Sequence, residues 1–76
     1  MDIKTAIGER IRQLRNQKGL SQEEFAHRAD IDRTYVARLE SGKRNVTIIA
    51  LQKVIKALET DYRNFFNHSM FINGRE

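Results

Sequence analysis

The sequence contains no cysteine and no proline, and it has only four glycines in 76 residues. The lack of cysteine excludes disulfides, cysteine nucleophiles and cysteine-bound zinc. Without proline and with few glycines, helices are favoured over a turn-rich β fold. No apolar run approaches the roughly 20 residues that a membrane-spanning helix needs, and no signal-peptide pattern opens the chain. We therefore expect one domain over residues 1–76, located in the cytoplasm.

Charges of both signs are present, with 14 Lys and Arg against 10 Asp and Glu, for a formal net charge of +4. A chain with 39% apolar and 32% charged residues has the composition of a folded domain rather than of a disordered tail. The positive balance is compatible with a nucleic-acid partner, but by itself it is weak evidence. Because a chain this short buries only roughly 60% of the surface of its unfolded form, its core must be economical or shared with a partner.

Apolar residues recur with helical spacing near the start of the chain. Steps of four, four and three positions form one stripe, which predicts a helix over about residues 3–18: Ile3, Ile7, Ile11 and Leu14. Gly19 stands where a left-handed residue would end this helix. The first helix therefore has one apolar face for the core and basic residues on its other faces.

Three helix starts follow, and each has an apolar residue before the cap and another four positions after it. The caps are Ser21, Asp32 and Thr47. Glu24 lies three positions after Ser21 and completes a capping box. These starts predict helices at about 22–29, 33–40 and 48–58. Because only residues 30–32 separate the second helix from the third, the pair forms a helix–turn–helix.

Asp61 is expected to cap a short last helix that carries Tyr62, Phe65 and Phe66, and residues 67–76 show no clear period. The predicted fold is therefore all-α, a compact bundle of about five helices that contains a helix–turn–helix.

The outward face of the third helix is the main candidate for a binding surface. With Val36 and Leu39 in the core, positions i, i+1, i+4 and i+5 form one exposed strip, here called the recognition strip: Arg33, Thr34, Ala37 and Arg38. Arginine can bind guanine O6 and N7 in the DNA major groove, and threonine offers a hydroxyl and a methyl group. The alternative is an ordinary solvated face with salt bridges from Arg33 to Asp30 or from Arg38 to Glu40.

Other side chains could contact the DNA backbone around this strip. Gln22 begins the second helix, where its amide and the free N–H groups of the helix could hold a phosphate, although an exposed Gln with no role is the alternative. The loop after the third helix supplies further candidates: Lys43, Arg44 and Asn45. Tyr35 has two interpretations, a hydroxyl on a phosphate or a buried edge with a water-bonded hydroxyl. Arg10 or Arg12 could add a contact or form a solvated face.

Catalysis is not expected. His27 and His68 are the only histidines, and the sequence has neither a glycine-rich phosphate loop nor a nucleophile elbow. His27 with Glu23 and Asp30 could form a weak divalent site, but an ordinary charged surface explains them as well. We therefore expect no enzyme, no cofactor and no metal.

Three stretches resemble the Cro-type (XRE-type) helix-turn-helix DNA-binding domain of phage repressors and bacterial regulators: LSQEEFA (20–26), IDRTYV (31–36) and LESGKR (39–44). The resemblance covers about residues 7–58, and within the family it is nearest to controller proteins of restriction–modification systems. It implies a homodimer on a pseudo-palindromic operator. Position by position, it implies phosphate contacts from Gln22 and from the loop 42–44, and base contacts from the recognition strip. The chain departs from the family pattern at Asp30, where Gly is frequent, and at Val46, where Pro is frequent.

The dimer interface is expected in the C-terminal third, with residues 59–76 as a dimerisation or tail segment. Ile49 lies off the core stripe of its helix, which comprises Ile48, Leu51, Val54, Ile55 and Leu58. Phe65 and Phe66 join Ile49 as interface candidates, and the tail adds Met70, Phe71 and Ile72. Alternatively, Phe65 or Phe66 folds back over the first helix.

The sequence thus predicts a sequence-specific transcriptional regulator that binds double-stranded DNA as a homodimer. The alternative is an antitoxin or protein-interaction module that kept the fold, because fold does not determine function. Activation of transcription would require a patch that touches RNA polymerase, and the sequence leaves that partner open.

Overall fold

The computed structural model describes residues 1–72. Within that range the chain forms five α-helices and one short 3-10 helix: α1 (Ile3–Gln17), α2 (Gln22–Ala29), α3 (Arg33–Glu40), α4 (Ile48–Ala57), α5 (Tyr62–Phe66) and η1 (Ser69–Phe71). No strand occurs in the described part of the chain. The prediction of an all-α bundle of about five helices is therefore confirmed, and the helix boundaries agree to within a residue.

The predicted caps form as expected. The Ser21 hydroxyl accepts a hydrogen bond from the Glu24 amide at 3.0 Å, and the Glu24 carboxylate accepts one from the Ser21 amide at 2.8 Å. Asp32 and Thr47 cap α3 and α4 in the same way, by accepting from backbone amides of the first turn. Asp30 ends α2 in the left-handed conformation at φ 57°, so the aspartate takes the place where the family often has Gly.

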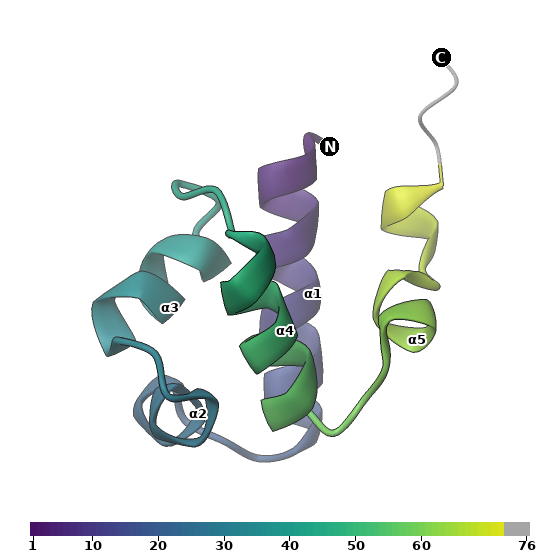
Figure 1. Ribbon diagram of the computed structural model, residues 1–76. Coiled ribbons are helices and arrows are strands. Elements are labelled where there is room, and N and C mark those ends of the chain that lie inside the picture. The colour runs from purple at the N-terminus through teal and green to yellow at the C-terminus, as the bar shows by residue number, and fades with distance from the viewer. Residues whose placement is uncertain (73–76) are drawn as a thin grey trace.

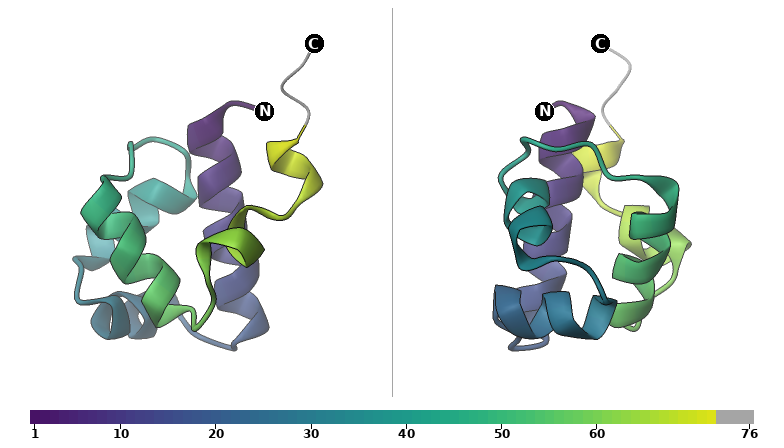
Figure 2. Two further views of the ribbon diagram at one scale, coloured as in Figure 1. Left: turned by 45° about the vertical axis from the view of Figure 1, so that its right-hand side comes forward. Right: turned by 60° about the vertical axis from the view of Figure 1, so that its left-hand side comes forward.

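The helix α1 lies between α3 on one side and the C-terminal segment of α5 and η1 on the other (Figures 1 and 2). The second helix packs against both α3 and α4. The largest fully buried side chains come from five helices: Ile11, Phe25, Val36, Leu39, Val54 and Phe65. One core therefore holds the helix–turn–helix and the C-terminal segment together.

Two residues assigned to apolar stripes are not in the core. Ile3 is 60% exposed and Ile48 is 84% exposed. Each is the first residue of its helix, where neighbouring helices no longer cover the stripe. The prediction that Ile48 packs on the core is therefore wrong.

The prediction that Phe65 lies in a dimer interface is also wrong, because its side chain is fully buried within one chain. The ring of Phe66 packs edge-on against that of Phe65, with the centroids 5.0 Å apart, and Phe71 completes an aromatic cluster over the core. Phe66 remains half-buried. The alternative expectation, that these aromatics fold back over the first helix, is confirmed for Phe65.

Arg10 of α1 holds the C-terminal segment of α5 and η1 against α1. Its guanidinium donates to the carbonyl oxygens of Asn64 and Phe65, both at 2.7 Å. Burial lowers the pKa of Arg10, and the guanidinium also donates to the side-chain oxygen of Gln13. Arg10 is only 7% exposed, so the expectation of a backbone contact with DNA from this residue is wrong. Residues 73–76 of the expected tail lie outside the described residues.

None of the helices in residues 1–72 combines the length and the apolar character needed to cross a membrane.

Candidate nucleic-acid interface

The recognition strip is on the surface, as the sequence predicts. Arg33, Thr34 and Arg38 are exposed and Ala37 is half-buried, whereas Val36 and Leu39 on the opposite face are fully buried. Asp32 caps the start of α3, and its carboxylate accepts a hydrogen bond from the Thr34 amide at 3.0 Å. This cap determines where the first turn of α3 starts, and therefore which side chains point outward.

The expected salt bridges of the strip do not form. In the described part of the chain, four ion pairs occur and neither arginine of the strip takes part in any of them: Arg12–Glu9, Arg12–Glu40, Arg15–Glu40 and Lys18–Glu59. Glu40, the expected partner of Arg38, turns into the protein instead. The alternative interpretation of the strip as a face laced with salt bridges is therefore wrong.

A hollow of about 200 Å³ lies between the start of α2 and the strip, and its lining residues are Gln22, Arg33, Thr34 and Ala37. The fold thus brings Gln22 together with three members of the strip. The hollow is bordered by an amide, a guanidinium, a hydroxyl and a methyl group. These groups are the donors and apolar contacts suited to base edges and phosphates.

Tyr35 contacts the loop after α3. Its hydroxyl donates to the carbonyl oxygen of Asn45 at 3.3 Å and accepts from the Thr47 amide at 3.2 Å. The guanidinium of Arg44 lies 5.0 Å from the centre of the ring, within cation–π range. The hydroxyl proton of Tyr35 is thus donated within the protein in the absence of DNA, and a phosphate contact from Tyr35 stays a prediction.

The loop itself keeps its basic residues on the surface. Lys43, Arg44 and Asn45 are all exposed, and they follow the C-terminal end of α3, here also called the recognition helix. Gly42 has φ +76°, and a Cβ at this position would come within 3.0 Å of the Thr5 hydroxyl. The loop therefore turns sharply against α1 and directs Lys43 and Arg44 outward.

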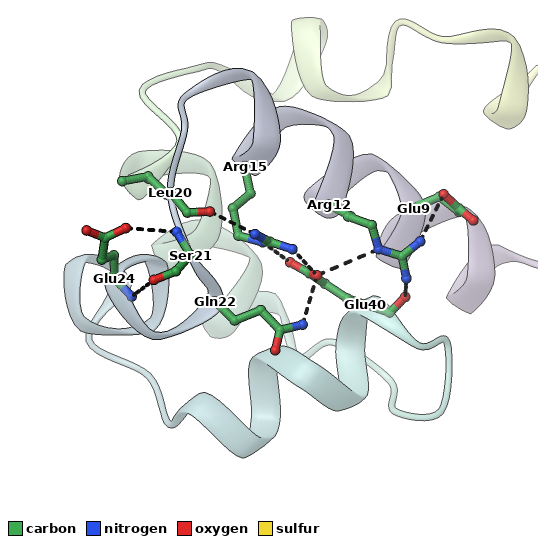
Figure 3. A network of polar contacts seen from close by, with 8 residues as sticks. All are labelled: Glu9, Arg12, Arg15, Leu20, Ser21, Gln22, Glu24 and Glu40. Carbon is green, nitrogen blue, oxygen red and sulfur yellow. Dashed lines mark hydrogen bonds and ion pairs between the residues drawn. The ribbon is translucent and has the colours of Figure 1, made fainter.

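Glu40 has a role in this site that its position in the sequence does not indicate. It is only 3% exposed, and its carboxylate accepts two hydrogen bonds from Arg15, at 2.7 and 2.8 Å. It also accepts from Nε2 of Gln22 at 3.1 Å, and Arg12 donates to its backbone carbonyl at 2.9 Å. Figure 3 shows these side chains converging from α1, α2 and α3. The hydrogen bonds to Glu40 raise the pKa of Arg15.

Glu23, His27 and Asp30 do not form a metal site, because residues 1–72 contain no group of three His, Asp or Glu side chains placed to hold an ion.

Comparison with known proteins identifies the family. The helix-turn-helix family matches residues 11–65, and the chain belongs to it. This family consists of DNA-binding transcriptional regulators rather than enzymes. The resemblance to Cro-type domains is thereby confirmed.

Several relatives and solved structures similar to this chain are controller proteins of restriction–modification systems. It is 42% identical to the control protein C.MunI of Mycoplasma sp over 67 residues, which cover 87% of this chain and 90% of C.MunI. The crystal structure of the restriction–modification controller protein C.AhdI from Aeromonas hydrophila is 41% identical, with a TM-score of 0.79 over 83% of this chain and 96% of C.AhdI. The controller protein C.Esp1396I, as a tetramer in complex with its natural 35 base-pair operator, is 33% identical. Its TM-score is 0.83 over 95% of this chain and 92% of that one.

Structures of C.Esp1396I with single replacements of a consecutive Arg, Thr and Tyr are similar as well, with TM-scores of 0.83, 0.81 and 0.84.

Proposed function

We propose that this chain is a sequence-specific transcriptional regulator that binds an operator as a homodimer and controls a restriction–modification system. The observation that carries the proposal is the exposed recognition strip on α3, whose two arginines have no acidic partner in residues 1–72. Support comes from the similarity to control proteins over nearly the whole chain and from the operator complex of C.Esp1396I. Such a protein acts on cytoplasmic DNA.

The recognition strip enters the major groove. Arg33 and Arg38 each bind a guanine edge, and Thr34 and Ala37 contact a neighbouring base through a hydroxyl and a methyl group. This chain contains the tripeptide Arg33, Thr34 and Tyr35, which has the same order as the residues replaced in C.Esp1396I. Tyr35 contributes by holding the loop that follows α3.

The backbone contacts flank the strip on two sides. Gln22 and the N-terminal amides of α2 bind one phosphate, because the free N–H groups and the positive end of the helix dipole favour an anion there. Lys43, Arg44 and Asn45 bind the backbone beyond the other end of α3. These contacts orient the domain on DNA and do not distinguish sequences.

The dimer forms through the exposed apolar start of α4. Ile49 is 62% exposed and Ile48 is 84% exposed, so two consecutive isoleucines lie open to solvent at the start of α4. Within residues 59–72, Tyr62 is exposed and Phe66 is half-buried. Pairing about a two-fold axis places two copies of α3 roughly 34 Å apart, one turn of DNA, which matches an inverted repeat.

The experiment that tests the function is a salt series of binding to an operator selected from random duplexes, compared with unselected DNA. Arg33→Ala should weaken operator binding by about 1–3 kcal/mol and relax the preference at one base pair. Lys43→Ala should weaken binding to both DNAs alike and reduce the salt slope by about 1. If no duplex is enriched, or if Arg33→Ala weakens both DNAs equally, the strip does not read sequence, and a protein-interaction module is the better interpretation.

A further inference from the structure

Gln22 contacts a buried carboxylate in the protein without DNA. Its Nε2 donates to Glu40 at 3.1 Å, while its amide oxygen points away from Glu40 (Figure 3). Glu40 comes from the last turn of α3, whereas Gln22 is the first residue of α2. The contact therefore joins the phosphate-binding end of one helix to the far end of the recognition helix.

This contact selects one orientation of the Gln22 amide. A glutamine side chain can rotate so that either its NH₂ group or its oxygen faces a neighbour, but an ionised carboxylate only accepts hydrogen bonds. An amide oxygen turned toward Glu40 would meet two acceptor atoms in a site from which water is excluded, because Glu40 is only 3% exposed. The NH₂ group therefore stays on the Glu40 side.

Glu40 is itself held in place from α1. Arg15 donates to both of its carboxylate oxygens, and Arg15 in turn donates to the carbonyl oxygen of Leu20 at 2.7 Å. Two parallel hydrogen bonds from one guanidinium fix the plane as well as the position of a carboxylate. The orientation of Gln22 is thus determined by a chain of charge-assisted contacts that begins on α1 and passes through α3.

We propose that Glu40 is a positioning residue for DNA binding, which holds the Gln22 amide with Nε2 inward so that its second N–H is ready for a phosphate. The proposal rests on the function proposed above. Gln22 borders the same hollow as Arg33, Thr34 and Ala37, so its orientation is set where the DNA arrives. Without Glu40, the amide samples both orientations and several rotamers, and it must be ordered when DNA binds. Ordering one such side chain corresponds to about fivefold in affinity.

A double-mutant cycle tests the proposal with Glu40→Gln, Gln22→Ala and the two combined. Glu40→Gln should lower operator affinity about fivefold when Gln22 is present. In the Gln22→Ala background, the same change should leave affinity within about twofold. Urea unfolding of all four proteins measures the coupling between Glu40 and Gln22 in stability, so that the coupling in operator affinity can be compared with it. A merely structural role of Glu40 would lower DNA affinity equally in both backgrounds, and that result would overturn the proposal.

Gln17→Ala is the matched control for Gln22→Ala. Gln17 is an exposed glutamine whose side chain makes no hydrogen bond within residues 1–72. Glu40→Gln should therefore cost the same factor in operator affinity with Gln17→Ala as without it.

A second measurement needs no variant and so covers the case in which Glu40→Gln does not fold. In the ¹⁵N-labelled wild-type protein, one Nε2 proton of Gln22 should be shifted downfield and exchange slowly, unlike the side-chain amides of the exposed Gln17 and Gln52. An amide pair for Gln22 that matches those two would contradict the proposal. If the wild-type protein binds no DNA, both the proposed function and the positioning role of Glu40 are contradicted. If it binds DNA but the double-mutant cycle shows no coupling in operator affinity, only the positioning role of Glu40 is contradicted.

Discussion

Gly8 of α1 lies so close to the carbonyl oxygen of Leu39 that a Cβ at this position would overlap with it. The same Cβ would come within 2.9 Å of the carbonyl oxygen of Glu40. The two helices therefore cross backbone to backbone, at the end of the recognition helix. This close approach brings Arg12 and Arg15 within hydrogen-bonding distance of Glu40.

Gly8→Ala should therefore destabilise the protein by about 3 kcal/mol, because the backbones of α1 and α3 would have to move apart. In an unobstructed helix interior the same change stabilises by about 1 kcal/mol, so the sign of the effect is the test. The free energy of unfolding in urea measures it. Gln17→Ala, at an exposed position of the same helix, serves as the control and should change stability little. An unchanged or increased stability for Gly8→Ala would show that the helices do not cross this closely.

Tyr35→Phe should lower the free energy of unfolding by about 1 kcal/mol, because it removes the hydroxyl that joins Asn45 and Thr47. Tyr62→Phe is the control, since Tyr62 is 49% exposed and its hydroxyl makes no hydrogen bond within residues 1–72. Urea unfolding of both variants gives the comparison. Equal effects of the two substitutions would mean that the Tyr35 hydroxyl does not hold the loop.

Ile49→Glu should weaken dimerisation and operator binding together while leaving the helical content unchanged, because Ile49 is exposed in the monomer. A carboxylate buried at a two-fold interface also faces its own copy, and like charges there are unfavourable. Analytical ultracentrifugation and circular dichroism make the measurement, and Gln52→Glu, an exposed position on the same helix, is the control. A wild-type protein that is monomeric at concentrations that saturate the operator would contradict the dimer. Phe66→Glu is no substitute, because Phe66 packs in the aromatic cluster.

Stability should decrease as the pH falls below 4.5, in part because of Glu24. The hydrogen bond from the Ser21 amide lowers the pKa of Glu24 below its ordinary value of 4.5. A carboxylate whose pKa is lower in the folded state stabilises the fold above its unfolded pKa, and this contribution is lost as the pH falls through the folded pKa. We therefore expect the free energy of unfolding of Glu24→Gln to decrease less with falling pH than that of the wild-type protein. Urea unfolding at a series of pH values measures this.

Glu24→Gln should still lose some stability at low pH, because the pKa values of groups such as Asp2 and Glu59 are also lowered by hydrogen bonds. Glu23→Gln is the control, because Glu23 is a neighbouring exposed residue outside the capping box. If Glu24→Gln and the wild-type protein lose the same stability as the pH falls, the role of the Ser21–Glu24 capping box is contradicted.

The positions of the helices and the exposed strip follow from the sequence alone. A cap joins a side chain to a backbone amide two or three residues away, as Ser21 and Asp32 do, so the information is local. The outward direction of Arg33 and Arg38 follows from helical spacing once Val36 and Leu39 are assigned to the core. Neither inference requires knowledge of which helix lies opposite.

The tertiary structure alone decided which charged residues are covered and with which groups they pair. Arg15 and Glu40 are 25 positions apart, and Arg10 and Phe65 are 55 apart, so no local pattern relates them. Glu40 occupies an ordinary charged position in its helix, and only the approach of α1 buries it. Burial and pairing depend on the elements that pack against a residue, and that arrangement is a property of the whole chain.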